Sequence, residues 1–428
     1  MTAGAKEIPS PDRATRGIEP DRLSPVPLSL ARRLDVVKPS VTLAMNARAA
    51  ELRTKGLDVF AFGVGEPDFE PPALVLDAAR KALDTSVSKY TAVTGIPTLK
   101  QAICARTTAI RGWTPKPGQI TVAIGAKHAL FNLALALYEP GDEVIIPAPY
   151  WVSYPEQVKI VGAEPVIVET EESNGFKMTP EAFAKAFTPR TKAVILCTPS
   201  NPTGSAYNEA ELRALLDVWK KSDAWLIVDE IYADLVYDGF KHVSAASILA
   251  GSPEMDRLVI VDGVSKTYAM TGWRIGWSIA PERLAKALDT VQGQSTTNAT
   301  AIAQHAAVAA LNGPQDTVES MRAAFEKRRG VMIEGLRSIP GVKCHMPEGA
   351  FYAFADCRSL YGLAYKGKPI ASDEDVAFFL LDEAHVAAVP GGAFGAPGYI
   401  RFSYATSEDR IRGGIEAIKK AVAAAKRT

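Results

Sequence analysis

Six short apolar runs, separated by amphipathic helical patterns and by turns rich in Pro and Gly, occupy the chain between about residues 60 and 300. The runs are Ile120–Ile124, Glu143–Pro147, Pro165–Glu169, Ala193–Cys197, Trp225–Asp229 and Leu258–Asp262. A run that is apolar at every position is what a strand needs when helices bury both of its faces. The pattern predicts an α/β fold in which helices cover a mostly parallel sheet. Ligands of such sheets bind beyond the carboxyl ends of the strands.

The 428 residues exceed the roughly 250–300 at which a single hydrophobic core stops growing, so we expect two domains. A long helical pattern runs from about Gly313 to Leu336, and another helix rich in Ala and Lys follows Ser407. Between them lie three strand candidates, Ala350–Ala355, Ala387–Val389 and Tyr399–Ser403. This order predicts a second, smaller α+β domain. Residues 1–28 are rich in proline and mixed charge and lack an apolar segment, so we expect a disordered extension there.

The formal net charge is zero, because 48 Lys and Arg residues balance 48 Asp and Glu residues. That balance does not favour nucleic acid or an anionic membrane as a partner, so an anion site has to be built locally. No apolar run approaches the roughly 20 residues that span a bilayer. The four cysteines include no closely spaced pair, and the five histidines show no metal-ligand spacing. We therefore expect a cytoplasmic protein without a metal site.

One lysine stands alone among small and apolar residues in the segment Val264–Gly276. A lysine ammonium in a desolvated setting loses its proton readily, so Lys266 is a candidate amine for trapping a carbonyl group. Arg274, eight positions later and close to two glycines, suits a fork to a phosphate or carboxylate. Asp229 ends an apolar run upstream. An amine for a Schiff base, an acid for a pyridinium nitrogen and an arginine for a phosphate are what pyridoxal phosphate requires of a protein.

Four further motifs accompany apolar runs. Gly125-Ala126-Lys127 opens an amphipathic helix directly after a strand candidate, where backbone N–H groups can bind an anion. Asn201 lies in a segment rich in proline that, taken alone, is typical of a turn. Trp151 follows Pro149-Tyr150 and offers either a ring-stacking surface or a core side chain. Arg401 lies in an apolar strand candidate, where a guanidinium needs a partner such as a substrate carboxylate or a structural acid.

In their order and spacing these motifs resemble the class I, or fold-type I, pyridoxal phosphate-dependent aminotransferases, and specifically the bacterial aspartate aminotransferase group. The turn Gly65-Glu66-Pro67-Asp68 and the segment Lys89-Tyr90-Thr91 belong to the same resemblance, which covers residues 30–425. It implies that the helix around Val41–Gly56 joins the small domain and that the long helix bridges the two domains.

The resemblance also assigns the catalytic and cofactor residues. Lys266 is expected to form the Schiff base and move the substrate proton, while Asp229 pairs with the pyridine nitrogen. Tyr232 and Asn201 are expected to bind the phenolic oxygen, and Trp151 to stack on the ring. The phosphate is expected to contact Ala126, Lys127, Ser265, Arg274 and, across a dimer interface, Tyr90. Gly263 stands where the family has a serine donor, so Ser265 is expected to replace that donor in part.

For the substrate, the resemblance implies that Arg401 grips the α-carboxylate, with Gly65, Trp151 and Asn201 lining the site. Lys127, Ser40 and Thr42 correspond to donors for a distal carboxylate. These assignments predict a ping-pong aminotransferase acting on L-aspartate or L-glutamate and a 2-oxo acid. Prephenate and aromatic amino acid aminotransferases, lyases, decarboxylases and regulatory proteins on the same scaffold remain alternatives.

The expected domain boundaries follow from the same reasoning. Residues 29–62 form an N-terminal arm and part of the small domain, and residues 63–312 form the large cofactor-binding domain. Residues 313–428 form the bridging helix and the rest of the small domain. The partners expected are small-molecule substrates and a second copy of the chain in a homodimer with shared active sites, without nucleic acid or membrane.

Overall fold

The computed structural model describes residues 29–37, 41–85 and 87–427, without the side chains of residues 41–44 and 46. The predicted extension over residues 1–28 and the candidate residue Ser40 lie outside the described residues. Thr42 lies in the first helix, and its side chain is outside the description as well.

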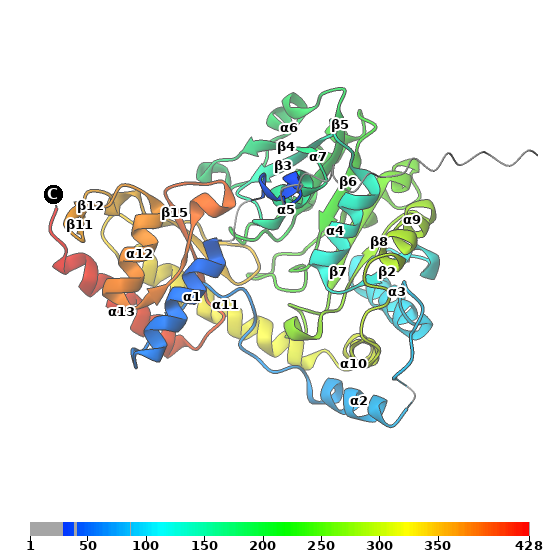
Figure 1. Cartoon of the computed structure of the whole chain (residues 1–428), viewed down its shortest axis with the longest axis horizontal. Helices are drawn as coiled ribbons and strands as arrows, with labels where there is room; N and C mark the ends of the chain where they lie inside the picture. The colour runs from blue at the N-terminus through cyan, green and yellow to red at the C-terminus, as the bar shows by residue number, and fades with distance from the viewer. Residues whose placement is uncertain (1–28, 38–40, 86, 428) are drawn as a thin grey trace, which may run out of the picture.

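A sheet of seven strands forms the centre of the larger lobe (Figure 1). In spatial order its strands are β2 (Ile120–Ala123), β8 (Gly276–Ile279), β7 (Leu258–Gly263), β6 (Trp225–Asp229), β5 (Thr191–Cys197), β3 (Glu143–Ala148) and β4 (Glu164–Glu169). Only β8 pairs antiparallel with its neighbours, so the prediction of a mostly parallel sheet is confirmed. All six predicted runs form strands of this sheet, whereas β8 was not predicted.

Two layers of helices bury the two faces of this sheet. One layer consists of α4 (Ala126–Leu137), α5 (Ser153–Ile160) and α9 (Glu282–Gly293). The other contains α3 (Pro97–Arg111), α6 (Pro180–Ala186), α7 (Glu209–Trp219), α8 (Ala245–Leu249) and α10 (Ala301–Asn312), and α2 (Ala73–Leu83) packs against α10. Along β5, Ala193 and Ile195 pack in the first core, and Val194 and Leu196 pack in the second. Consecutive residues therefore enter different cores, which explains why the run is apolar throughout.

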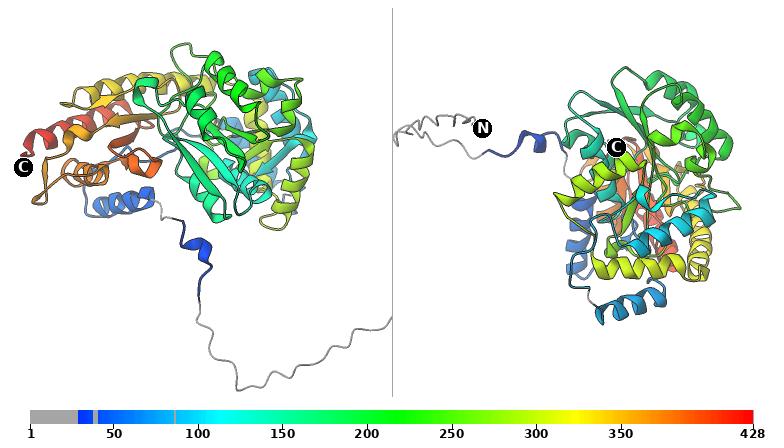
Figure 2. Two further views of the ribbon diagram at one scale, coloured as in Figure 1. Left: turned by 90° about the horizontal axis from the view of Figure 1, so that it is seen from above. Right: turned by 90° about the vertical axis from the view of Figure 1, so that its right-hand side faces the viewer.

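The smaller lobe is an α+β unit, as predicted. Its antiparallel sheet has the order β14 (Val389–Pro390), β15 (Tyr399–Ser403), β10 (Tyr352–Asp356) and β9 (Lys343–Cys344). Two short pairs accompany it, β1 (Phe60–Ala61) with β13 (Val386–Ala387), and β11 (Ala364–Tyr365) with β12 (Lys368–Pro369). Helices α1 (Val41–Thr54), α12 (Asp373–Ala384) and α13 (Glu408–Ala424) lie around this unit (Figure 2). Ser407 caps α13 by accepting a hydrogen bond from the Arg410 backbone.

Two of the predicted strands of the smaller lobe differ from the structure. The candidate Ala350–Ala355 begins only at Tyr352, because Ala350 has a φ of 58°, a left-handed conformation that cannot continue a strand. The candidate Ala387–Val389 is two separate strands. β13 pairs with β1, whereas β14 pairs with β15, so the chain changes sheets at Ala388.

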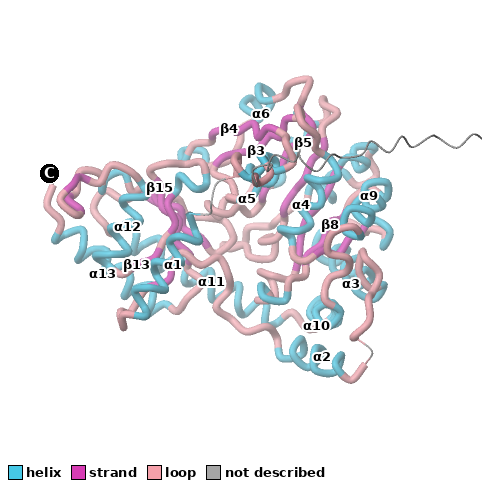
Figure 3. The backbone as a smooth tube through the Cα atoms, in the orientation of Figure 1, coloured by secondary structure: helices cyan, strands magenta, loops and turns pink. Residues whose placement is uncertain are grey.

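The long helical pattern forms helix α11 (Asp316–Arg337), which connects the two lobes (Figure 3). Val318 packs in the core of the larger lobe, and Met321 and Phe325 pack in the core of the smaller one. Phe325 is fully buried against Phe69 and Phe351, with ring centroids 5.4 Å and 5.2 Å away. Among the described helices, none combines the length and the apolar character needed to cross a membrane.

Phe325→Ala tests how much this junction stabilises the fold. Removing a fully buried aromatic ring leaves a cavity, so the free energy of unfolding should fall by about 3–5 kcal/mol. Phe378 is 38% exposed on α12, and Phe378→Ala should cost less than about 1 kcal/mol. Denaturant unfolding followed by circular dichroism measures both. Equal losses in the two variants would contradict the placement of Phe325 in the core.

Candidate active site

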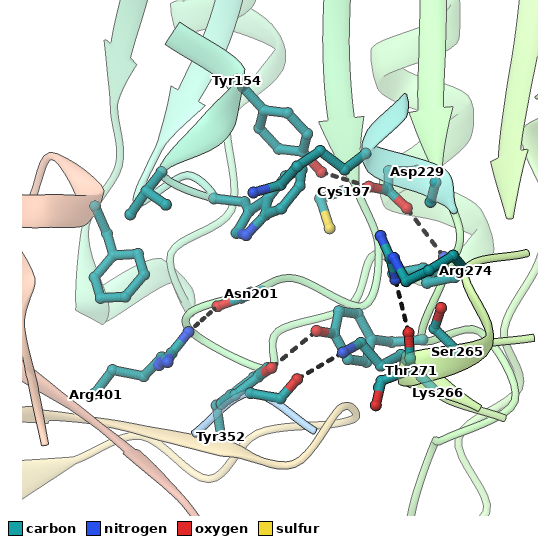
Figure 4. A pocket seen from close by; sticks show the side chains of 18 residues that line it. Tyr154, Cys197, Asn201, Asp229, Ser265, Lys266, Thr271, Arg274, Tyr352 and Arg401 are labelled. Carbon is teal, nitrogen blue, oxygen red and sulfur yellow. Dashed lines mark hydrogen bonds between the residues drawn. The ribbon is translucent and has the colours of Figure 1, made fainter. Parts of the chain in front are cut away.

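The carboxyl ends of three neighbouring strands bring predicted site residues to one edge of the large sheet (Figure 4). Asp229 ends β6, Asn201 follows β5, and Lys266 follows β7. They line a cavity of about 410 Å³. The other predicted residues in its wall are Gly65, Ala126, Lys127, Trp151, Tyr232, Ser265, Arg274 and Arg401. Parallel strands explain this convergence, because their carboxyl ends meet at the same edge.

The amine of Lys266 points into the cavity and is held by a single hydrogen bond. Its Nζ donates to the Gly65 carbonyl oxygen at 2.6 Å. Burial lowers the pKa of Lys266 to about 8, although the nearby carboxylate of Glu66 opposes the shift. A substantial fraction of this amine is therefore neutral near pH 8, the state in which nitrogen acts as a nucleophile or a base.

Asp229 is 4% exposed and is the buried acid of the cavity. The Tyr154 hydroxyl donates to its Oδ2 at 2.8 Å, and the Ile231 backbone N–H donates to its Oδ1 at 3.1 Å. Burial raises the pKa of Asp229 to about 6, while these two hydrogen bonds limit the rise. Asp229 is therefore ionised at neutral pH, and it forms no ion pair with any cation of the described residues. A cationic group of a ligand would complete this site.

The start of α4 and Arg274 form one end of the cavity, a candidate anion-binding end. α4 begins at Ala126, after Gly125, which has a φ of 83°. A Cβ atom on Gly125 would lie 2.6 Å from Arg274 Nη2, so the guanidinium packs directly against this turn. Lys127 Nζ lies 5.0 Å from the centre of the Trp151 ring. The pKa of Lys127 is lowered mainly by burial and also by the nearby positive charge of Arg274. Backbone N–H groups and two cations thus converge on one volume.

Arg401 brings a buried positive charge from β15 into the same cavity. Its Nη1 donates to Asn201 Oδ1 and its Nη2 to the Gly63 carbonyl oxygen, both at 2.9 Å. The rings of Tyr352 and Phe394 lie 4.5 Å and 4.9 Å from the guanidinium carbon. Within the described part of the chain, Arg401 has no carboxylate partner and its Nε makes no hydrogen bond. A buried guanidinium in this state fits an anionic ligand.

One described residue among the predicted ones, Tyr90, does not line this cavity. Tyr90 is 89% exposed on the surface of the single chain. Ser40 and the side chain of Thr42 lie outside the described residues. No group of three or more potential metal ligands occurs among the residues that the structure describes.

Comparisons with known proteins agree with this geometry. Residues 58–418 match the family described as "Aminotransferase class I and II". The chain belongs to this aminotransferase family. The aspartate aminotransferase of Geobacillus stearothermophilus is 48% identical over 92% of this chain and 98% of the relative. The aspartate/prephenate aminotransferase of Cereibacter sphaeroides is 46% identical over 88% and 94%.

Solved aminotransferases share the fold. The aspartate aminotransferase of Rhizobium meliloti aligns with a TM-score of 0.89 at 44% identity, covering 93% of this chain and 100% of that structure. The Thermus thermophilus aspartate aminotransferase, solved with maleate, aligns with a TM-score of 0.86 at 41% identity, covering 92% and 99%.

Several residues that line the cavity of this aminotransferase were not predicted: Val152, Tyr154, Cys197, Ile231, Thr271, Tyr352 and Phe394. Most lie within five residues of a predicted one, so proximity to a motif was an available signal. Tyr352 had no such signal, because its apolar run resembles an ordinary core strand. The structure shows that its hydroxyl lies 2.9 Å from that of Tyr232.

Gly276→Ala tests the anion-binding end of this aminotransferase. A Cβ atom at Gly276 would lie 2.3 Å from the Ala126 backbone nitrogen, so it must displace the start of α4. Losing one charge-assisted contact costs about 1.5–3 kcal/mol, so affinity for inorganic phosphate should fall about 10- to 150-fold. Gly272→Ala is the matched control, since no atom lies within 4 Å of its added Cβ. Calorimetric titration of the protein with inorganic phosphate measures both, and unchanged binding in Gly276→Ala would exclude this site.

Proposed function

We propose that the chain is a pyridoxal phosphate-dependent aspartate aminotransferase, which moves an amino group between L-aspartate or L-glutamate and a 2-oxo acid. The observation that carries the proposal is the arrangement of four groups around one cavity. They are the amine of Lys266, the buried carboxylate of Asp229, the anion-binding end at Arg274, and the guanidinium of Arg401. Relatives named aspartate aminotransferases, and one of them solved with the dicarboxylate maleate, support this substrate class.

The residues of the cavity fit pyridoxal phosphate. Its aldehyde matches the amine of Lys266, and its phosphate matches Arg274, Ser265 and the start of α4. Its pyridine nitrogen, when protonated, matches Asp229, which lacks a cationic partner among the described residues. We further assign Trp151 to the ring face and Asn201 and Tyr232 to the phenolic oxygen.

When bound, pyridoxal phosphate supplies an aldehyde that condenses with amines and a ring that withdraws electrons from the substrate α-carbon. Lys266 Nζ acts as the base that takes the proton from the α-carbon and later returns it, and its lowered pKa provides the neutral amine. Asp229 is ionised above about pH 6 and would keep the pyridine nitrogen of the bound cofactor protonated. Tyr154 orients Asp229 through its 2.8 Å hydrogen bond.

Arg401 would bind the α-carboxylate that every amino acid substrate carries, with Gly65 and Asn201 beside it. Lys127 would bind the distal carboxylate of an acidic substrate, together with Ser40 and Thr42. Lys127 is suited to this role because it lies on the face of Trp151, inside the cavity, instead of pairing with an acid of the described residues.

The assembly and the domains are part of the proposal. Residues 63–312 would form the cofactor-binding domain, and residues 29–62 and 313–428 the arm, bridging helix and small domain. Tyr90, exposed on one chain, would reach the phosphate in the neighbouring subunit of a homodimer. We propose a cytoplasmic enzyme on the basis of its four free cysteines.

Prephenate is a second candidate acceptor. Relatives from Cereibacter sphaeroides and Nitrosomonas europaea, at 46% and 44% identity, are named aspartate/prephenate aminotransferases. The aromatic wall formed by Trp151, Tyr352 and Phe394 offers apolar contact area for a ringed substrate.

The function is tested by mixing the cofactor-loaded enzyme with single amino acids and following its visible absorbance. L-Aspartate and L-glutamate should convert the cofactor to its amine form and release a 2-oxo acid, and adding oxaloacetate or prephenate should reverse the change. Lys266→Ala should retain the fold but lose both this conversion and the label that borohydride places on the lysine. Release of ammonia or carbon dioxide in place of a 2-oxo acid would show that the enzyme is a lyase or a decarboxylase.

Arg401→Ala and Lys127→Ala should have different substrate dependence. Arg401→Ala should lower kcat/KM about 10- to 150-fold for aspartate and phenylalanine alike, because both carry an α-carboxylate. Lys127→Ala should lower it by a similar factor for aspartate and glutamate only, when the cofactor is saturating. Equal losses for acidic and apolar substrates in Lys127→Ala would assign this lysine to the phosphate alone and favour prephenate or aromatic substrates.

A further inference from the structure

A buried guanidinium lies outside the cavity and faces three carboxylates at once. Arg111 is the last residue of α3, and its side chain is only 6% exposed. Its Nε lies 3.0 Å from Glu230 Oε2, its Nη1 lies 3.5 Å from Asp234 Oδ1, and its Nη2 lies 3.2 Å from Asp262 Oδ2. Each nitrogen therefore has a different acid. None of these four side chains lines the cavity described above.

Each of the three carboxylates is next to, or hydrogen-bonded to, the segment that carries Asp229 or Lys266. Glu230 directly follows Asp229 in the chain. Asp234 Oδ2 accepts a hydrogen bond at 3.1 Å from the hydroxyl of Thr267, which directly follows Lys266. Asp262 lies near the end of β7, and its Oδ1 accepts from the Gly263 backbone N–H at 2.7 Å, just before the segment that carries Lys266. Arg111 thus ties together the loops that follow β6 and β7.

The buried cluster of Arg111 and its three carboxylates contributes little net stability for the free energy that its burial costs. Burying ions costs more than their attraction usually returns, and apolar residues of the same size often serve as well. Burial opposes the charge on Arg111, yet Asp234, Glu230 and Asp262 hold its pKa above the usual value. Burial also raises the pKa of Asp262 to about 7. Two other basic side chains of the described residues lie near these acids: the guanidinium of Arg106, 3.6 Å from Asp234, and the imidazole of His242, 3.5 Å from Glu230.

We propose that Arg111 is a positioning residue for the aminotransferase reaction. Through its contacts with the three carboxylates, it holds the loops that carry Asp229 and Lys266 at a fixed distance from each other. This inference rests on the proposed function, because it concerns the distance between the acid and the amine of that site. A guanidinium suits the task because its nitrogens point in three fixed directions, whereas a lysine ammonium is a single point of charge.

Arg111→Met should change Lys266 in the cofactor-free protein. Without Arg111, the loops after β6 and β7 are no longer held together, so water reaches the amine. The three carboxylates also lose the positive charge that faces them. The pKa of Lys266 should therefore rise from its value of about 8. A rise of one pH unit leaves about a tenth of the amine neutral at pH 8 in place of about half, so its labelling by acetic anhydride should slow about fivefold. Labelling across pH 6–10, read by mass spectrometry of the Lys266 peptide, measures this change.

The cofactor-loaded enzyme provides a second measurement. In Arg111→Met, kcat for aspartate should fall at least about tenfold, while KM should change less than about threefold, because Arg111 does not line the cavity. Arg111→Lys should lie between the wild type and Arg111→Met. Arg329→Met is the matched control, since Arg329 is also 6% exposed but binds Asp238 and the Pro347 carbonyl oxygen. It should lower stability without changing the labelling of Lys266.

Thr267→Val keeps the test valid if Arg111→Met does not fold. It removes the hydrogen bond from Thr267 to Asp234 and changes no charge, and it should slow labelling of Lys266 in the same direction. Thr121→Val is its control, because the buried Thr121 hydroxyl has no hydrogen-bond partner among the described residues. A wild-type labelling profile in Arg111→Met, or in Thr267→Val if Arg111→Met does not fold, would overturn the positioning role. The labelling needs no cofactor or substrate, so a failure of the proposed function would appear separately, in the aspartate reaction of the wild type.

Discussion

Desolvation of two charged groups at the ends of neighbouring strands is the constraint on which the rest of this site depends. The same burial lowers the pKa of Lys266 to about 8 and raises that of Asp229 to about 6. In both groups burial disfavours the charged form, which costs free energy. The fold tolerates this cost because the sheet beneath is buried on both faces. The apolar cores on either side of β6 and β7 therefore supply the stability that allows two poorly solvated groups to face one cavity.

The second constraint is that the cavity needs both lobes. Arg401 lies in β15 of the smaller lobe, yet it donates to Asn201 beyond β5 of the larger one. Tyr352 of β10 lies within hydrogen-bonding distance of Tyr232 beyond β6. α11 packs in both cores and connects the two lobes. A change in how the lobes meet would alter the contacts of Arg401 while leaving Lys266 and Asp229 on their strand ends.

The strands of the larger lobe and most of the candidate site could be predicted from the sequence for a common reason. A strand buried on both faces is apolar throughout, and candidate site residues follow the carboxyl ends of five of the six predicted runs, the exception being the run that forms β4. The strand β8 was missed because Gly276–Ile279 has four residues and includes Gly276 and Ser278, so it forms no continuous apolar run although all four residues are buried. Tyr352 was missed because it belongs to an apolar run that is typical of a core strand. The acidic partners of Arg111 were missed because they lie far from it in the sequence.

By itself, the sequence determined the alternation of strands and helices, the acid, amine and arginine that follow particular strands, and the balance of charge. These are local properties, set by side-chain polarity and by spacing along the chain. Only the tertiary structure decided which groups are desolvated, that Arg401 lacks a carboxylate partner among the described residues, and that Arg111 faces three acids. Those properties depend on distances between segments far apart in sequence, which packing of the two lobes and the sheet creates.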